Sequence, residues 1–170
     1  MKKVLLVGSV ALFLVLTGCS QKKAEPEVVK KEEVVVVDTG RDNFIDMERD
    51  RLAKQLKGEL QTVKFDFDKF NIRKDMQPVV DTDAKVLGGA NLSGLNVKLE
   101  GNCDEWGSDE YNYALGLKRA KGVRDALSAK GVSANDFILI SYGESNPVCT
   151  EHTKSCWAQN RRVDFDVIPQ

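Results

Sequence analysis

The stretch that most constrains the fold runs from residue 101 to residue 127 and reads GNCDEWGSDEYNYALGLKRAKGVRDAL. It begins where a run of alternating apolar residues ends, as at the end of a strand. After an acidic turn, Ser108 and the two acidic residues behind it are typical of a helix N-terminus, because they satisfy free backbone N–H groups and oppose the helix dipole. A helix is therefore expected from Ser108 to Lys130, where Gly131 ends it.

The predicted helix carries two neighbouring stripes. The stripe expected to be buried has apolar residues and a glycine at helical spacing: Tyr113, Gly116, Ala120, Val123 and Leu127. The stripe expected at the edge of the packed face is Asn112, Leu115, Arg119 and Gly122. Each interior glycine destabilises a helix by roughly 1 kcal/mol relative to alanine. We therefore expect these glycines where the helix approaches the sheet closely.

The remaining pattern alternates strands and helices. Alternating apolar residues predict strands at 61–67, 95–99 and 162–168, and the apolar run at 137–141 predicts a further strand. Residues 72–87 have helical spacing with Pro78 inside, so this helix is expected to start late or to kink, and 44–59 predicts a short lead-in helix. The order strand, helix, strand, helix, strand, strand predicts an α+β domain over residues 60–170, with helices covering a sheet of mixed direction.

The N-terminus reads as an export segment. Residues 1–18 contain two lysines followed by an apolar core that is too short to span a membrane comfortably. The run Leu-Thr-Gly-Cys that ends at Cys19 resembles the bacterial lipobox, which implies a lipid on Cys19 after cleavage. Ser20, which is not acidic, then implies the outer membrane by the sorting rule of some Gram-negative bacteria. The alternative is an ordinary signal peptide with an incidental cysteine.

Residues 19–43 follow as a lipidated N-terminus and flexible tether. They are rich in Lys, Glu, Val and Asp and contain few large apolar residues, a composition that favours an unpacked chain. The run 34–37 consists of four valines. It could add as a strand to a partner, or it could be a disordered apolar patch.

Four segments carry a resemblance to a known family: FDFDKF, GNCDEWGSDEYNYALGLKRA, SYGESNP and AQNRRVDF. In this order they resemble the OmpA C-terminal-like peptidoglycan-binding domain. The resemblance implies a β-α-β-α-β-β fold with two helices packed on one side of a four-stranded mixed sheet. It also implies non-covalent binding of the peptidoglycan peptide stem at its diaminopimelate.

With the lipobox and tether, the resemblance implies an outer-membrane lipoprotein with its domain in the periplasm, tying the membrane to the cell wall. It further implies partnership with TolB and other Tol components in envelope integrity and cell division. An OmpA-like wall-anchoring lipoprotein without Tol partners is the alternative.

Two charged residues match the ligand-binding positions of the family. Asp104 matches an aspartate after the second strand, and Arg119 matches an arginine in the following helix. The free end of diaminopimelate bears an ammonium and a carboxylate on one carbon, so a carboxylate and a guanidinium across a gap suit it, since arginine can bind a carboxylate with two parallel hydrogen bonds. The alternative is an internal ion pair between Asp104 and Arg119 that fixes the turn to the helix.

Other matches extend the expected site. Phe67 and Asp68 match ligand contacts at the end of the first strand, and Leu115 and Leu117 match helix positions lining the site. Asn112 and Arg161 match positions that we interpret as mainly structural.

The chain departs from the family at two positions. Cys103 replaces a common threonine. Trp106 replaces a common arginine, which removes a cation, and its ring could instead pack over the aliphatic part of the ligand.

The resemblance also bears on the cysteines, because OmpA carries a disulfide in the loop before the last strand. It implies a Cys149–Cys156 bridge in an oxidising periplasm, with Cys103 left free. A zinc site built from these three cysteines and His152, the only histidine, is the alternative.

Charge and motifs argue against other function classes. The chain has 25 basic and 26 acidic residues, a balance that does not indicate a nucleic-acid binder. G-x-S-x-G, H-E-x-x-H and P-loop motifs are absent from the sequence. We therefore expect neither an enzyme nor a cofactor, although an enzyme acting on the cell wall is the competing hypothesis.

Overall fold

The computed structural model describes residues 40–170. The predicted signal peptide, the lipid on Cys19 and nearly all of the predicted tether, including the valine run, lie outside the described residues. Within residues 40–170, no helix combines the length and the apolar character needed to cross a bilayer.

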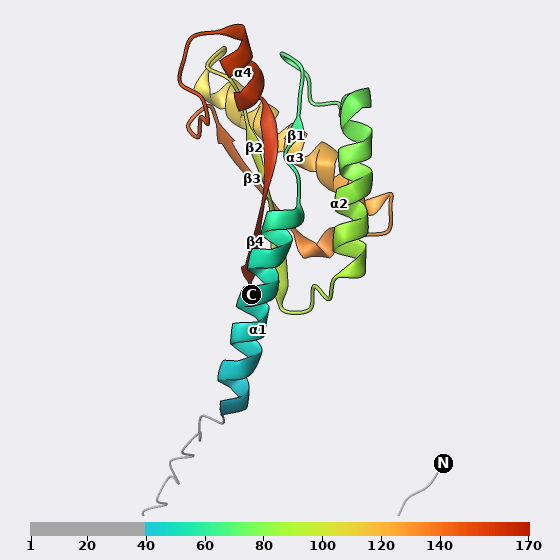
Figure 1. Ribbon diagram of the computed structural model, residues 1–170. Coiled ribbons are helices and arrows are strands. Elements are labelled where there is room, and N and C mark those ends of the chain that lie inside the picture. Colours follow the sequence, from blue (N-terminus) through green and yellow to red (C-terminus); the bar gives the residue numbers. More distant parts are fainter. Residues whose placement is uncertain (1–39) are drawn as a thin grey trace, which may run out of the picture. The chain divides into compact units, whose positions relative to one another are not determined.

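Four helices and four strands form the domain (Figure 1). In chain order they are α1 (Gly40–Glu59), β1 (Val63–Lys64), α2 (Gln77–Gly89), β2 (Leu95–Asn102), α3 (Asp109–Ser128), β3 (Phe137–Gly143), α4 (Lys154–Asn160) and β4 (Arg162–Pro169). Short 3-10 turns precede α2 and β3. The predicted late start of the second helix is confirmed, since Pro78 lies in the first turn of α2.

The sheet is mixed, with strand order β1-β4-β2-β3. β2 runs parallel to β3, whereas β4 is antiparallel to both β2 and β1. One face of the sheet joins α2 and α3 in an apolar core that includes Val97, Leu99, Val123 and Phe165. The predicted α+β class and helix-covered mixed sheet are confirmed.

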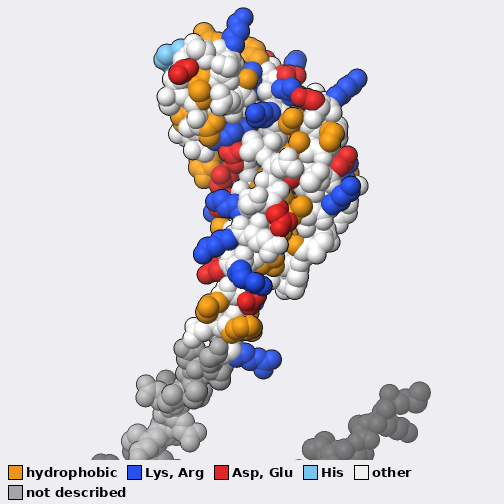
Figure 2. All heavy atoms as spheres, viewed as in Figure 1, with side chains coloured by type: hydrophobic (Ala, Val, Ile, Leu, Met, Phe, Trp, Pro, Cys, Tyr) orange, Lys and Arg blue, Asp and Glu red, His pale blue; other side chains and the backbone are white. Residues whose placement is uncertain are grey.

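The lead-in helix α1 is longer than predicted and takes part in the core. Ala53 and Leu56 of its second half are buried in the apolar cluster, and α1 lies along β4 (Figure 1). Its first half extends beyond the body of the domain, where Phe44 and Met47 are exposed and hydrophobic side chains gather at the surface (Figure 2). Elsewhere on that face acidic and basic side chains are interspersed (Figure 2).

The helix expected after Ser108 is present as α3, and its predicted cap is confirmed. The Ser108 hydroxyl accepts a hydrogen bond from the Tyr111 backbone N–H. At its far end, Gly131 has φ +98°, a conformation that favours glycine.

The predicted buried stripe of α3 is partly wrong, because Tyr113 is exposed. Asn112, Leu115 and Arg119 of the neighbouring stripe are buried instead. The cause is a contact between backbones: a Cβ on Gly116 would lie 2.8 Å from the Gly101 carbonyl oxygen of β2. This close approach sets the rotation of α3 about its axis, so that Asn112, Leu115 and Arg119 face the sheet. The expectation that a helix glycine allows close approach to the sheet is confirmed for Gly116.

The first strand is shorter than the predicted 61–67. After Lys64, the Phe65 N–H still donates to the Arg161 carbonyl at 2.9 Å, just before β4 begins. No further β4 residue remains to pair with Phe67, whose side chain is exposed. The chain then turns at Asp68, which has φ +55°.

Candidate ligand-binding groove

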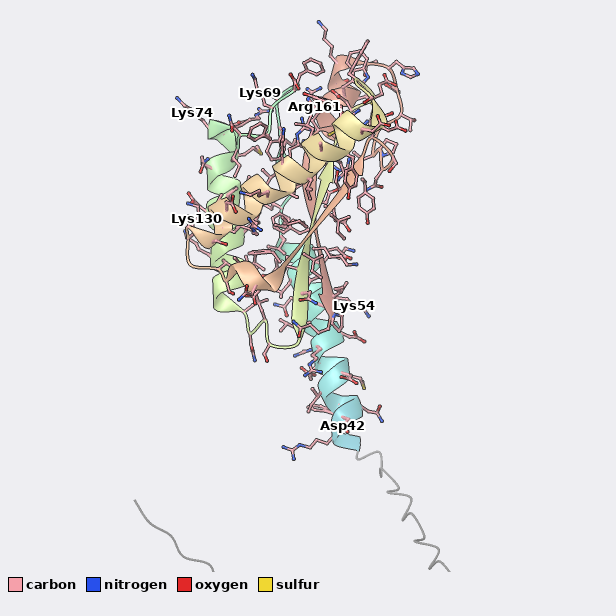
Figure 3. The ribbon with its side chains drawn as sticks, turned by 180° about the vertical axis from the view of Figure 1, so that it is seen from behind. Asp42, Lys54, Lys69, Lys74, Lys130 and Arg161 are labelled. Carbon is pink, nitrogen blue, oxygen red and sulfur yellow. A yellow bond between two sulfur atoms is a disulfide. The ribbon has the colours of Figure 1, made fainter. Side chains whose placement is uncertain are left out.

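A groove of about 340 Å³ lies where the loop after β1 meets the turn between β2 and α3. Its lining residues are Phe67, Asp68, Asp104, Trp106, Gly107, Tyr111 and Leu115. In Figure 3, Lys69 and Arg161 mark this end of the domain, and Asp42, at the start of α1, lies at the opposite end. The loop, the turn and the first helical turns of α3 therefore build the groove together.

Asp104 is fixed in this groove by hydrogen bonds. Its side chain is largely buried, and Oδ2 accepts a hydrogen bond from Arg161 Nη1 at 2.8 Å. The Asn112 side-chain amide donates to the Asp104 carbonyl at 3.3 Å. Among residues 40–170, no donor reaches Oδ1. The carboxylate thus has one oxygen held by arginine and the other available to the groove that Asp104 lines.

Arg119 does not face Asp104 across a gap, so the predicted opposed couple needs correction. Its side chain is 0% exposed. Nε donates to the Lys69 carbonyl at 2.8 Å, Nη1 to the Asn102 carbonyl at 2.8 Å, and Nη2 to the Asp66 carbonyl at 3.2 Å. Burial lowers the pKa of Arg119. The guanidinium lies behind the groove and joins the end of β2 to the loop after β1.

The alternative of an internal Asp104–Arg119 ion pair is not seen either. Within the described chain, the ion-pair partner of Asp104 is Arg161, whose Nε also donates to the Phe65 carbonyl at 3.3 Å. Arg161 therefore has the structural role predicted for it, and in addition it orients the carboxylate of the groove.

Three aromatic side chains form much of the groove wall. Phe67, Trp106 and Tyr111 are 58%, 53% and 50% exposed, unlike the core aromatic Phe65. The Tyr111 hydroxyl donates to the Asp68 carboxylate, which raises the pKa of Tyr111. The groove is consequently aromatic and acidic, and two of its aromatic rings come from the turn before α3 and from α3 itself.

A network behind Trp106 holds that wall in place. The ring of Trp157 in α4 meets Trp106 edge to face, with ring centroids 5.3 Å apart. Glu105 Oε1 accepts a hydrogen bond from Trp157 Nε1 at 2.7 Å and lies 2.7 Å from His152 Nδ1. The bond with His152 lowers the pKa of Glu105, and Glu105 in turn raises the pKa of His152.

The loop that carries this network is cross-linked. Cys149 and Cys156 form a disulfide with a Cα–Cα distance of 5.2 Å, the pairing that the resemblance implies. The Asn160 side chain accepts from the Val148 and Cys149 N–H groups and donates to the Cys149 carbonyl at 2.7 Å. The disulfide uses two thiols of the alternative zinc site. That site would need both as thiolates.

Cys103, the remaining thiol in residues 40–170, is free and buried. Its sulfur accepts from Arg119 Nη1 at 3.3 Å and donates to the Asn112 carbonyl at 3.3 Å. Burial raises the pKa of Cys103 to about 11, so the thiol stays protonated and serves as a hydrogen-bonding link.

The structure brings most of the predicted site residues together. Those that line the groove are Phe67, Asp68, Asp104, Trp106 and Leu115. Leu117 lies on the exposed side of α3, and Arg119 lies behind the groove. Sequence reasoning missed Tyr111, although its position in the first turn of the predicted helix, beside the acidic turn, was a usable signal. It also missed Gly107, whose φ of +125° shapes the turn.

The chain is similar in sequence to known proteins. The OmpA family model matches residues 64–161. The chain belongs to the OmpA family. It is similar to the peptidoglycan-associated lipoprotein of Pseudomonas aeruginosa, with 44% identity over 106 residues, covering 62% of this chain and 61% of that protein. The protein of the same name from Pasteurella multocida is 40% identical over 111 residues, covering 65% and 73%.

Solved structures show the same fold. The crystal structure of the peptidoglycan-associated lipoprotein from Burkholderia pseudomallei matches with a TM-score of 0.59 and 38% identity, covering 64% of this chain and 90% of that one. The C-terminal domain of Helicobacter pylori MotB matches with a TM-score of 0.59 at 22% identity, covering 65% and 85%. The matched region spans about three fifths of the P. aeruginosa relative, 61% of its length. The predicted resemblance is thereby confirmed at the level of the family and its lipoprotein members.

Proposed function

We propose that this chain is an outer-membrane lipoprotein whose periplasmic domain binds peptidoglycan non-covalently and so ties the membrane to the cell wall. Membership of the OmpA family and similarity to peptidoglycan-associated lipoproteins support this proposal. The role is that of a structural binding module, not of an enzyme.

The observation that carries the proposal is the state of Asp104 in the groove. One carboxylate oxygen is held by Arg161 and the other has no donor among the described residues. Because the side chain is largely buried, an ammonium group that reaches Oδ1 would be attracted more strongly than in water. The ammonium of a diaminopimelate stem fits this requirement, and the aromatic wall fits its aliphatic part.

The direction of α1 is compatible with an N-terminal anchor. α1 begins at the end of the domain opposite the groove (Figure 3). A domain attached to a membrane through the chain before α1 would therefore keep the groove accessible to the wall. The lipid on Cys19 itself is proposed from the lipobox alone.

A finer proposal concerns partners. By similarity to peptidoglycan-associated lipoproteins, we propose that the chain acts with TolB and other Tol components, the Tol-Pal system, in envelope integrity and cell division. A TolB pull-down tests this part separately. If TolB were not pulled down, an OmpA-like anchoring lipoprotein without Tol partners would be favoured. The proposal that the domain binds the cell wall would be unaffected.

Co-sedimentation with purified sacculi tests wall binding. The wild-type chain should pellet with sacculi, whereas Asp104→Asn, which keeps an acceptor for Arg161 but removes the charge, should stay in the supernatant. Asp50→Ala is the matched control, because it removes an exposed carboxylate of α1 far from the groove. Equal pelleting of wild type and Asp104→Asn would contradict the proposal, and release of muropeptides from the sacculi would indicate an enzyme instead.

A further inference from the structure

We propose that the outer edge of β3, together with a cavity at its C-terminal end, binds an extended basic segment of a partner protein by strand addition. The segment would pair its backbone with β3 and place a lysine or arginine side chain in the cavity. This surface is separate from the groove that we assign to peptidoglycan, and the proposal does not depend on that assignment.

β3 forms one border of the sheet, since it is the last strand in the order and pairs with β2 alone among the described strands (Figure 1). Backbone N–H and C=O groups along such a border can pair with an added strand, and natural edge strands are usually protected by charged residues or proline. β3 reads FILISYG and contains neither. Its pairing with β2 is regular from Phe137 to Ser141, and Ile138 is 38% exposed. This border is therefore regular and unprotected.

A cavity of about 680 Å³ lies at the C-terminal end of this border. Its lining residues are Asp109, Glu110, Tyr113, Tyr142, Gly143, Glu144 and Ser145. They come from the start of α3, from the end of β3 and from the two residues after β3. Because Tyr142 and Gly143 belong to both the strand and the cavity, a strand added to β3 would reach the cavity.

Helix geometry separates this cavity from the groove. Tyr111 and Leu115 line the groove, whereas Asp109 and Tyr113 line the cavity. Residues two positions apart on an α-helix point in directions about 200° apart. The first turns of α3 therefore present the groove and the cavity on opposite sides, and a ligand in one leaves the other open.

The cavity favours a positively charged side chain. Asp109, Glu110 and Glu144 supply three carboxylates, and none of the three has an ion-pair partner within the part of the chain that the structure describes. Of the described residues that line the cavity, none is a lysine, arginine or histidine. Two of the carboxylates also oppose the dipole of α3, but Glu144 comes from a different element. A cation entering the cavity would meet charges of the opposite sign alone.

Two tyrosines add to this preference. Tyr113 and Tyr142 are 56% and 38% exposed, and the faces of aromatic rings attract cations. The Tyr142 hydroxyl donates to Glu100 Oε1 at 3.3 Å, and the Ser141 hydroxyl donates to the Tyr113 carbonyl at 2.7 Å. Both rings are thus attached to positions that the fold fixes. Carboxylates beside aromatic rings suit the aliphatic stem and charged end of lysine or arginine.

The same charges favour a basic partner over a second copy of this chain. Antiparallel pairing of two β3 borders would place the cavity of each copy beside the start of β3 in the other. That start follows Asp136, so carboxylates would approach a carboxylate. A segment that alternates lysine or arginine with β-branched residues meets no such repulsion.

Fluorescence anisotropy of three labelled peptides, titrated with the full chain, tests the proposal. The probe KVKVKVK alternates lysine with valine, KPKPKPK keeps the charge but cannot form a regular β ladder, and EVEVEVE reverses the charge. We expect each of the last two peptides to bind at least about tenfold more weakly than KVKVKVK. Equal binding of KVKVKVK and KPKPKPK would show charge attraction without strand addition and overturn the proposal. Equal binding of EVEVEVE, or no binding of KVKVKVK, would overturn it as well.

Variants locate the probe on the molecule. Ile138→Lys introduces a charge on the border strand and should weaken KVKVKVK by at least about tenfold. The matched control Val148→Lys adds the same charge at an exposed apolar residue outside β3, and should change the affinity by less than about twofold. Glu144→Gln should weaken the probe by about threefold, whereas Asp50→Asn on α1 should leave it unchanged. Equal effects within either pair would contradict the proposal.

Two further measurements separate this surface from the alternatives. Pelleting of Ile138→Lys with sacculi should equal that of the wild type, because Ile138 lies outside the groove. Light scattering of the full chain in detergent should give the same mass for the wild type and Ile138→Lys. A wild-type dimer that Ile138→Lys converts to a monomer would assign the border to a second copy and overturn the proposal.

Discussion

The apolar middle of the domain and its polar end are built from the same two elements, β2 and α3, but they are held together differently. In the middle, Gly101 and Gly116 let strand and helix backbones touch, and apolar side chains fill the space around them. At the end, Arg119 of α3 donates to the Asn102 carbonyl of β2, and Arg161 holds Asp104. Shape therefore fixes the middle, whereas buried hydrogen-bonded charges fix the end and leave one carboxylate oxygen of Asp104 open to the groove.

The largest expected effect lies in the middle. In Gly101→Ala, the new Cβ would overlap the Gly116 carbonyl oxygen, a backbone atom that cannot move aside. We expect a loss of at least about 4 kcal/mol in the free energy of unfolding, measured by urea denaturation. The control is Gly58→Ala in α1, where the Cβ meets nothing within 4 Å and a gain of roughly 0.5–1 kcal/mol is expected. A stable Gly101→Ala domain would show that the close approach is not required.

At the polar end, Arg119→Lys should also destabilise the fold. Lysine cannot reproduce the planar set of donors, so carbonyls of the loop and of β2 lose their partners, at about 3 kcal/mol. Urea denaturation measures this, with Arg124→Lys as the control, because Arg124 of α3 is only partly buried and bonds to the neighbouring Asp125. If Arg119→Lys unfolded like the wild type but lost discrimination between stems, Arg119 would be a ligand contact and the two regions would not differ as described.

A buried carboxyl in the apolar middle should make stability depend on pH. Asp83 is buried, and although Oδ1 accepts from the Gln61 N–H at 3.0 Å, desolvation raises its pKa to about 6. The folded state then binds a proton that the unfolded state releases near its ordinary pKa of 3.8. Stability should fall as pH rises from about 4 to about 6, by roughly 2–3 kcal/mol, and stay level above.

The matched variants for this effect are on α2. Asp83→Asn should remove the slope between pH 4 and pH 6 and raise stability at pH 7, as measured by thermal unfolding across pH. Asp81→Asn, which changes an exposed carboxylate on the same helix, should keep the slope. A slope of the same size in Asp83→Asn would assign the pH dependence to another group.

The smallest effect concerns the wall of the groove. Trp157→Phe keeps a ring against Trp106 but removes the N–H that donates to Glu105. Loss of one hydrogen bond of about 1 kcal/mol should weaken muropeptide binding by roughly threefold to fivefold, with little change in unfolding. The variant leaves Trp106 as the single tryptophan, so its fluorescence anisotropy reports the mobility of the wall directly. Unchanged anisotropy and affinity would show that α4 does not position Trp106.

Much of the fold could be predicted from the sequence, because it depends on local pattern. The alternating strands, the Ser108 cap and the late start of α2 at Pro78 each follow from residues next to one another. Most residues of the groove were also predicted, through a resemblance whose segments surround the turn after β2.

The rest depended on contacts between distant segments. The helix α4 has seven residues and is held by a disulfide and by Asn160. It is too short for a periodic pattern in the sequence to indicate it. The burial of Arg119 and the exposure of Tyr113 follow from the rotation of α3 that the Gly101–Gly116 contact sets. Spacing alone does not indicate that Asp104 pairs with Arg161 instead of Arg119.

The central claim is that the free oxygen of Asp104 binds the ammonium of a peptidoglycan stem. The most direct measurement is isothermal titration of a diaminopimelate muropeptide into wild type and Asp104→Asn, with both folds checked by circular dichroism. We expect binding by the wild type and a loss of at least about a hundredfold in the variant, since a buried charge-assisted contact is worth a few kcal/mol. Equal affinities for two folded proteins would contradict the claim.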